Sequence, residues 1–156
     1  MEINLRKATI DDIADLIRLR IDFLSDGKKI SREEESAIRA QLEGYFSKHI
    51  PCGTFVGILA ETGGQIVSTA YLAVSERPAN TSFITGIVGT ILNVYTHPDY
   101  RKKGIATKVI ARITDEAKRI GVSHIELQAT AEGKPLYAKM GFTEPQAFTA
   151  MGLRVI

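Results

Sequence analysis

The sequence is poor in cysteine, and this scarcity excludes several kinds of site. Cys52 is the single cysteine among 156 residues, so neither an internal disulfide nor a multi-cysteine metal site can form. We expect Cys52 to be a semi-buried thiol, without a neighbouring base to make it a nucleophile. The three histidines are scattered, without the spacing of metal ligands. No metal site is therefore predicted.

Long apolar runs and an excess of one charge are also missing. No run approaches the ~18 apolar residues of a membrane span, and the first residues show no signal-peptide pattern, so we expect a cytoplasmic protein without membrane partners. Lys and Arg number 20 against 18 Asp and Glu, a net charge of +2. A nucleic-acid partner would call for a basic stripe with stacking aromatic residues, which this balance does not favour.

The chain also lacks repeats, low-complexity tracts and linkers. At 156 residues it is long enough to bury a core of its own. We therefore predict a single domain over residues 1–156.

The most informative feature present is the stretch 94–106. An apolar strand, a Pro-marked turn and a basic loop lead there directly into a helix. A helix N-terminus exposes unpaired N–H groups and carries a partial positive charge. Arg101, Lys102 and Lys103 surround that end, and Gly104 permits a close approach of the backbone. The stretch predicts a cradle for a polyanion such as a diphosphate.

Two common classes of diphosphate-containing ligand, dinucleotides and nucleoside triphosphates, are bound by sequence patterns that this loop does not match. A dinucleotide site would show G-x-G-x-x-G, and a nucleoside triphosphate site would show G-x-x-x-x-G-K-[ST]. Gly104 is followed by Ile105, and the remaining pattern is R-x-x-G-x-A. It resembles the acetyl-CoA pyrophosphate loop of the GNAT superfamily of N-acyltransferases, Q/R-x-x-G-x-G/A. A solvated basic turn between two core elements is the alternative interpretation of the loop alone.

Two further stretches strengthen the resemblance. Residues 133–142, G-K-P-L-Y-A-K-M-G-F, resemble the closing motif of the superfamily, a short helix that carries a tyrosine and ends at Gly-Phe. Residues 91–96 resemble the strand that pairs with pantetheine. The three motifs follow in the expected order over residues 89–142. Together they indicate an acetyl-CoA-dependent N-acetyltransferase.

Hydrophobic periodicity and turn signals predict the element order βααβββαβαββ. Thr9 with Asp12, and Ser31 with Glu34, are capping signals for the first two helices, and the second is expected to break at residues 51–53. Apolar spacing predicts a third helix over residues 106–120, and Pro-led residues 135–140 a short fourth. The predicted strands are 3–7, 54–61, 65–75, 83–96, 124–129 (buried), 142–143 and 148–155.

This order matches that of the GNAT superfamily. The resemblance implies an α/β (α+β) fold with a mixed, mostly antiparallel central sheet flanked by helices. It also implies that strands 91–96 and 124–129 splay apart and admit the cofactor. A homodimer is a habit of the family.

The resemblance also assigns the cofactor contacts. Val94, Tyr95 and Thr96 would pair with pantetheine through their backbone, and Arg101 would open and anchor the loop. The diphosphate would be held, mostly by main-chain N–H groups, at Lys102, Lys103, Gly104, Ile105, Ala106 and Thr107. Solvated side chains are the alternative for the two lysines. Residues 129–134 lack the Asn that many members use to contact the cofactor.

Two residues carry the predicted chemistry. The strand near Asn93 is expected to be distorted, so that a backbone N–H faces the thioester carbonyl and stabilises the oxyanion. Tyr137 is the predicted general acid: an ordinary tyrosine pKa of about 10, against about 8.5 for a thiol, keeps it protonated at neutral pH. A core tyrosine is the alternative, and the L-Y-x-x-x-G-F context favours the acid.

The general base and the acceptor stay open at this stage. The strand before the loop has no carboxylate, so Glu61, Glu126 or a chain of water molecules is considered, while His97 is expected to be a turn residue. A small metabolite, an antibiotic, a polyamine and a peptide N-terminus are all candidate acceptors. The expected acceptor surface includes Phe23, Asp26, Lys28, Tyr45, Phe46, Tyr71, Phe83 and Phe148.

The predicted function is transfer of the acetyl group of acetyl-CoA to a primary amine of a small molecule or peptide, by direct attack. The alternative is a non-catalytic acyl-CoA-binding regulatory module. The missing base favours this alternative, and the intact context of Tyr137 speaks against it.

Overall fold

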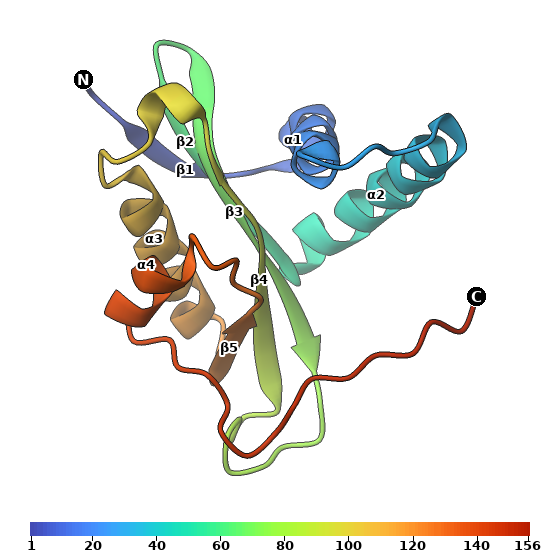
Figure 1. Ribbon diagram of the computed structural model, residues 1–156, viewed down its shortest axis with the longest axis vertical. Coiled ribbons are helices and arrows are strands. Elements are labelled where there is room, and N and C mark those ends of the chain that lie inside the picture. Colours follow the sequence, from blue (N-terminus) through green and yellow to red (C-terminus); the bar gives the residue numbers. More distant parts are fainter.

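A twisted sheet with helices on both faces organises the chain (Figure 1). The computed structural model describes all residues, 1–156. The elements follow one another as β1 (Asn4–Lys7), η1 (Ile10–Asp12), α1 (Ile13–Ser25), α2 (Arg32–Cys52), β2 (Phe55–Thr62), β3 (Gln65–Glu76), β4 (Ile87–Thr96), η2 (Pro98–Tyr100), α3 (Ile105–Arg119), β5 (His124–Leu127) and α4 (Lys134–Lys139), where η marks a short 3-10 helix.

The five strands lie in the order β1-β2-β3-β4-β5. Neighbours from β1 to β4 are antiparallel, and β5 runs parallel to β4. The hairpin between β2 and β3 turns at Gly63 and Gly64, whose φ angles of 56° and 76° suit a tight turn that twists with its strands. The predicted mixed, mostly antiparallel α/β fold is confirmed.

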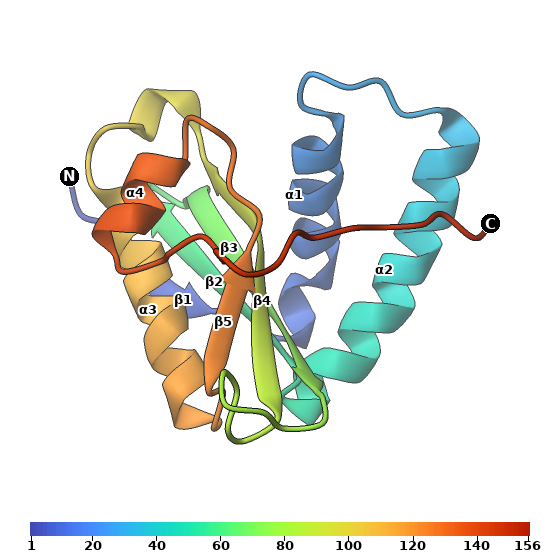
Figure 2. The ribbon, with the colours of Figure 1, turned by 60° about the horizontal axis from the view of Figure 1, so that its bottom comes forward.

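Two apolar layers fix the helices to the sheet. Both figures show α3 and α4 on one face and α1 and α2 on the other (Figures 1 and 2). On α3, Val109, Ile110, Ile113 and Ala117 are fully buried at helical spacing, so one face of the helix packs against the strands. On the opposite face, Leu16 of α1 and Phe46 of α2 pack on Tyr71 of β3 within a second cluster. No helix combines the length and apolar character that a membrane crossing requires.

The strands β4 and β5 pair over only part of β4. Residues 88–91 of β4 lie opposite His124–Leu127, and the pairing ends there. The remaining residues of β4, 92–96, keep β3 on one edge and have no strand on the other. Since Leu127 is also the last residue of β5, the structure shows a free edge along residues 92–96 of β4 rather than the two splayed strands implied by the family resemblance.

Several sequence-based boundaries need correction. The end of the second helix is not among them: it falls within the predicted residues 51–53, since the helix includes Pro51, runs to Cys52 and is ended by Gly53 (φ 74°), which donates its N–H to the carbonyls of His49 and Ile50. The strand predicted from residue 83 begins at Ile87, because residues 80–83 form a turn around the side chain of Asn80. Cys52 is exposed rather than semi-buried.

The end of the chain differs most from the prediction. Strands 142–143 and 148–155 do not form, and both figures show this segment leaving α4 as an extended chain toward the side of α2. Its large side chains, Phe148, Met151, Leu153 and Val155, are exposed, so no contact holds the segment in a ladder. The strand at 124–129 is shorter than predicted and not buried, since β5 is the edge of the sheet.

The start of the fold is held by a charged cluster around Asp12. Its carboxylate accepts from Arg6 at 2.8 Å on each oxygen and from the Thr9 N–H at 2.7 Å, and it is only 8% exposed. The hydrogen bond from Arg6 holds the pKa of Asp12 below its ordinary value. A carboxyl with a lowered folded-state pKa stabilises the fold above its unfolded pKa, and this contribution is lost as the pH falls through the folded pKa.

Asp12→Asn is therefore expected to lower the free energy of unfolding by roughly 1–3 kcal/mol at pH 7, because a charged hydrogen-bonding partner of Arg6 is lost. The difference from wild type should begin to shrink below about pH 4, the ordinary pKa of an aspartate in the unfolded chain, and vanish only below the lowered pKa of the folded state. Urea unfolding at several pH values measures both. Glu35→Gln, which breaks an exposed helix pair with Arg39, is the control and should cost about 0.5 kcal/mol; equal losses in the two variants would contradict this account of Asp12.

Candidate active site

The basic loop presents a row of unpaired backbone donors. None of the N–H groups of residues 102–107 donates a hydrogen bond within the protein, and the first paired one, Lys108, bonds to the carbonyl of Gly104 at 3.3 Å. Lys102 (φ 60°) and Gly104 (φ 75°) turn the backbone through left-handed conformations. A Cβ at Gly104 would meet no atom within 4 Å, so the space before the loop is open. Such a row at a helix N-terminus suits a diphosphate.

The basic side chains of the loop have different surroundings. Arg101 donates from Nε to the carbonyl of Thr96 at 2.8 Å, and its guanidinium lies 5.7 Å from the ring centre of Tyr95. These contacts tie the loop to the end of β4. Lys103 lies 5.4 Å from the ring centre of Tyr100, and neither Lys102 nor Lys103 has a carboxylate partner. The positive charge of both lysines is therefore available to an anion.

A bulge distorts β4 where β5 has already left it. Tyr71 of β3 lies opposite Leu92, and Thr69 lies opposite Tyr95, so two residues of β4 face one residue of β3. The bulge residue Asn93 has φ 57°, a conformation that asparagine tolerates better than most residues. Its buried side chain donates to the carbonyl of Leu19 at 3.4 Å. A bulge redirects backbone groups, and this one lies on the free edge of β4.

Tyr137 lies on α4, against the α3 face of the sheet. Its ring packs edge-on against Phe142, with centroids 5.9 Å apart, and it belongs to the buried cluster that includes Ile105 at the start of α3. The hydroxyl makes no hydrogen bond within the protein, although the residue is only 9% exposed. Burial raises the pKa of Tyr137 above its ordinary value, so the hydroxyl is protonated at neutral pH.

The two carboxylates considered as a base are engaged elsewhere. Glu61 accepts from Arg6 at 3.0 Å, and Glu126 accepts from Arg77 at 2.7 Å. The contact with Arg77 lowers the pKa of Glu126, which makes it a weaker proton acceptor. His97 accepts the N–H of Asp99 at 3.2 Å and caps η2, the position of a turn residue.

A small cavity of about 120 Å³ lies between α1 and the ends of β3 and β4. Of its lining residues, only Tyr95 belongs to the predicted site. Asp22 and His97 are the lining groups able to accept a proton. No pattern in the sequence points to Asp22, because only the packing of α1 on the sheet brings it to the bulged part of β4. The full lining is Arg18, Leu19, Asp22, Ile66, Val67, Ser68, Thr69, Tyr95 and His97.

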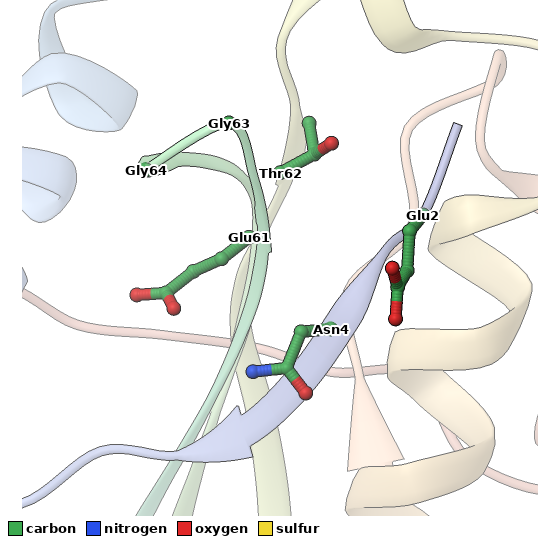
Figure 3. A pocket seen from close by; sticks show the side chains of 6 residues that line it. All are labelled: Glu2, Asn4, Glu61, Thr62, Gly63 and Gly64. Atoms are coloured by element: carbon green, nitrogen blue, oxygen red, sulfur yellow. The ribbon is translucent and has the colours of Figure 1, made fainter.

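A larger hollow of about 330 Å³ lies beside the β2–β3 turn and is lined only by polar residues and glycine (Figure 3). The side chain of Glu61 points away from Glu2, the other carboxylate of the lining (Figure 3). No group of acids, histidines and cysteines in the structure could hold a metal ion. With two acids and no cation, this hollow does not suit a diphosphate.

The expected acceptor surface does not form as one surface. Phe46 and Tyr71 are each 1% exposed, and the Tyr71 hydroxyl donates to the carbonyl of Leu16 at 2.8 Å. Both are core residues, because α1 and α2 pack directly on this part of β3. Phe83 lies in the β3–β4 loop and Phe148 in the extended end of the chain, so the named aromatic residues occupy separate places.

The family model described as an acetyltransferase (GNAT) domain matches residues 53–144. No curated protein matches this chain.

Solved structures resemble this chain over nearly its whole length. The structure of a predicted acetyltransferase with acetyl-CoA from Clostridium acetobutylicum is 33% identical, with a TM-score of 0.85 over 97% of this chain and 96% of that one. A GCN5-related N-acetyltransferase from Ralstonia eutropha is 26% identical, with a TM-score of 0.82 over 97% and 99%. Glucosamine-6-phosphate N-acetyltransferase from Arabidopsis thaliana, at 20% identity and a TM-score of 0.68 over 99% and 100%, shares the fold.

The open loop yields a prediction about anion binding. Gly104→Ala adds a Cβ that meets no protein atom but stands before the unpaired N–H groups and strains a left-handed backbone. We expect binding of inorganic pyrophosphate, measured by calorimetry, to weaken roughly tenfold, which is about 1.4 kcal/mol.

Gly53→Ala is the matched control. Gly53 also has a left-handed φ of 74° with open space at its Cβ, but it ends α2, on the other face of the sheet. Both variants should lose similar stability, about 1–2 kcal/mol, while only Gly104→Ala should lose anion affinity. Unchanged pyrophosphate affinity in Gly104→Ala would contradict the assignment of the loop.

Proposed function

Because this chain belongs to the GNAT acetyltransferase family, we propose that it transfers the acetyl group of acetyl-CoA to a primary amine by direct attack. One observation carries the proposal: the unpaired N–H groups of residues 102–107 open beside the end of β4, at the place where β4 has left β5. The anion-binding loop at residues 102–107 thus lies next to the free edge of β4.

Two parts of the chain would hold the donor. The N–H groups of residues 102–107, with the charges of Lys102 and Lys103, would bind its diphosphate. Val94, Tyr95 and Thr96 lie on the free edge of β4, where an extended amide-containing chain can add like another strand. Bound there, acetyl-CoA supplies an activated acyl group with a thiol as leaving group.

Two groups act on the reacting atoms. In the bulge at Asn93, a redirected backbone N–H would stabilise the oxyanion that forms on the carbonyl. The Tyr137 hydroxyl, protonated and without another partner, would donate its proton to the departing sulfur. The packing of Tyr137 on Phe142 and α3 supports this role, because it fixes the ring.

The attacking amine must also lose a proton. Glu61 and Glu126 are held by arginines at 2.9 and 2.7 Å, whereas Asp22 has only a longer, exposed contact with Arg18 at 3.7 Å. Asp22 and His97, which line the cavity beside Tyr95, are therefore the nearby acceptors. We assign the proton to one of these two groups, through water. The absence of a carboxylate from β4 favoured a regulatory acyl-CoA-binding module. A base outside β4 removes that reason for preferring the module.

Release of free thiol from acetyl-CoA tests the proposed transfer. The reaction is run against aminoglycosides, polyamines, amino acids and peptides, with a control lacking amine. Release stimulated by one class of amine is the expected result. Tight binding of acetyl-CoA with no stimulated release by any class would instead support the regulatory module.

Tyr137→Phe removes the proton donor and leaves the ring packing in place. We expect turnover to fall about a hundredfold, within the usual range for a general acid, while the dissociation constant of acetyl-CoA changes by less than twofold. Tyr100→Phe is the control, since the Tyr100 ring contacts Lys103 through its face and should keep full activity. Equal turnover in wild type and Tyr137→Phe would remove Tyr137 from the mechanism.

A further inference from the structure

Arg20 on α1 is a half-buried cation without an anionic partner. Other partly buried arginines are paired: Arg6 with Asp12 and Glu61, and Arg112 with Glu116. The one polar contact of the Arg20 guanidinium is a long one, 3.5 Å from Nη1 to the amide oxygen of Asn93. A buried charge without a counter-ion is costly, so its retention calls for an explanation.

The position of Arg20 places this charge at the bulge of β4. Arg20 follows Leu16 by one turn, and the carbonyl of Leu16 accepts from Tyr71. The carbonyl of the adjacent Leu19 accepts from Asn93. The guanidinium therefore lies over the bulge, on the α1 face of the sheet and opposite the face that α3 covers.

No acid of the protein neutralises Arg20. The nearest carboxylates on its own helix, Asp15 and Asp22, pair with Arg18. Tyr71 of β3 is the titratable group of the sheet whose charge would act on Arg20. Its hydroxyl is neutral, because burial raises its pKa. Desolvation correspondingly lowers the pKa of Arg20 below its ordinary value, although an arginine stays protonated at neutral pH.

We propose that Arg20 receives an anionic group of the acceptor, so that the substrate is a small amine carrying a carboxylate or a phosphate. The inference rests on the proposed acetyl transfer at the same bulge. A guanidinium binds either group through two parallel hydrogen bonds, and the pairing supplies the missing counter-ion. A polyamine or an aminoglycoside would instead bring further positive charge to an unpaired cation.

Matched pairs of amines that differ only in the anionic group test this directly. Each proteinogenic L-amino acid is compared with its carboxamide, and O-phosphoethanolamine with ethanolamine, by thiol release from acetyl-CoA. We expect kcat/KM at least tenfold higher for the anionic member of the best pair. The carboxylate and phosphate arms identify which anion is used. Equal values for both members of every reactive pair would overturn the proposal.

Arg20→Gln separates recognition from support of the bulge. Recognition predicts that KM for the anionic amine rises at least tenfold, while kcat/KM for its neutral counterpart changes less than twofold; Arg20→Lys should restore part of the loss. If Arg20 only orients Asn93, both amines lose activity alike, and the proposal is wrong. Arg39→Gln, on the exposed face of α2, is the control.

Binding without turnover distinguishes failure of this inference from failure of the transfer. The same pairs are added to protein saturated with coenzyme A, and the shift in melting temperature is measured in wild type and Arg20→Gln. An anion-dependent shift that Arg20→Gln abolishes, without thiol release, would support Arg20 and count against the transfer. Thiol release with neutral amines and no anion-dependent shift would overturn the role of Arg20 and leave the transfer standing. Neither shift nor release from any pair would overturn the role of Arg20, and the transfer would then be decided by the aminoglycosides, polyamines and peptides of the wider panel.

Discussion

The site depends on the parting of β4 from β5. The two strands share a ladder only along residues 88–91 of β4, and beyond it the edge of β4 is free. A parallel neighbour along the whole strand would occupy the backbone groups that we propose bind the donor. The bulge at Asn93 lies just past this point, so the free edge and the redirected backbone occur on the same few residues.

The helices on the two faces of the sheet bring different groups to the free edge of β4. On one face, α3 begins at a loop with unpaired N–H groups and lysines, and α4 holds Tyr137 in the same apolar layer. On the other face, α1 brings Arg20 to the bulge and Asp22 to the neighbouring cavity. In the proposed mechanism, donor recognition and acceptor recognition use separate layers that meet at β4, and each layer is positioned by its own buried cluster.

What the sequence could predict was local. The capping boxes at Thr9 and Ser31, the glycine turn at Gly63, and the loop before α3 depend on nearby residues, and the structure contains all of them. The proposed roles of Arg20 and Asp22 depend on neighbours more than 40 residues away in the sequence, which no pattern on α1 reveals. The prediction of strands after α4 is wrong for the same reason. Alternation of apolar and polar residues favours a strand only where a partner strand is available, and the segment after α4 has none.

Amide chemical shifts recorded while acetyl-CoA is added would locate the bound donor without requiring an acceptor. We expect the largest changes at residues 102–107 and at Val94, Tyr95 and Thr96. Changes concentrated instead on the hollow beside the β2–β3 turn, at Thr62, Gly63 and Gly64, with residues 102–107 unaffected, would contradict it.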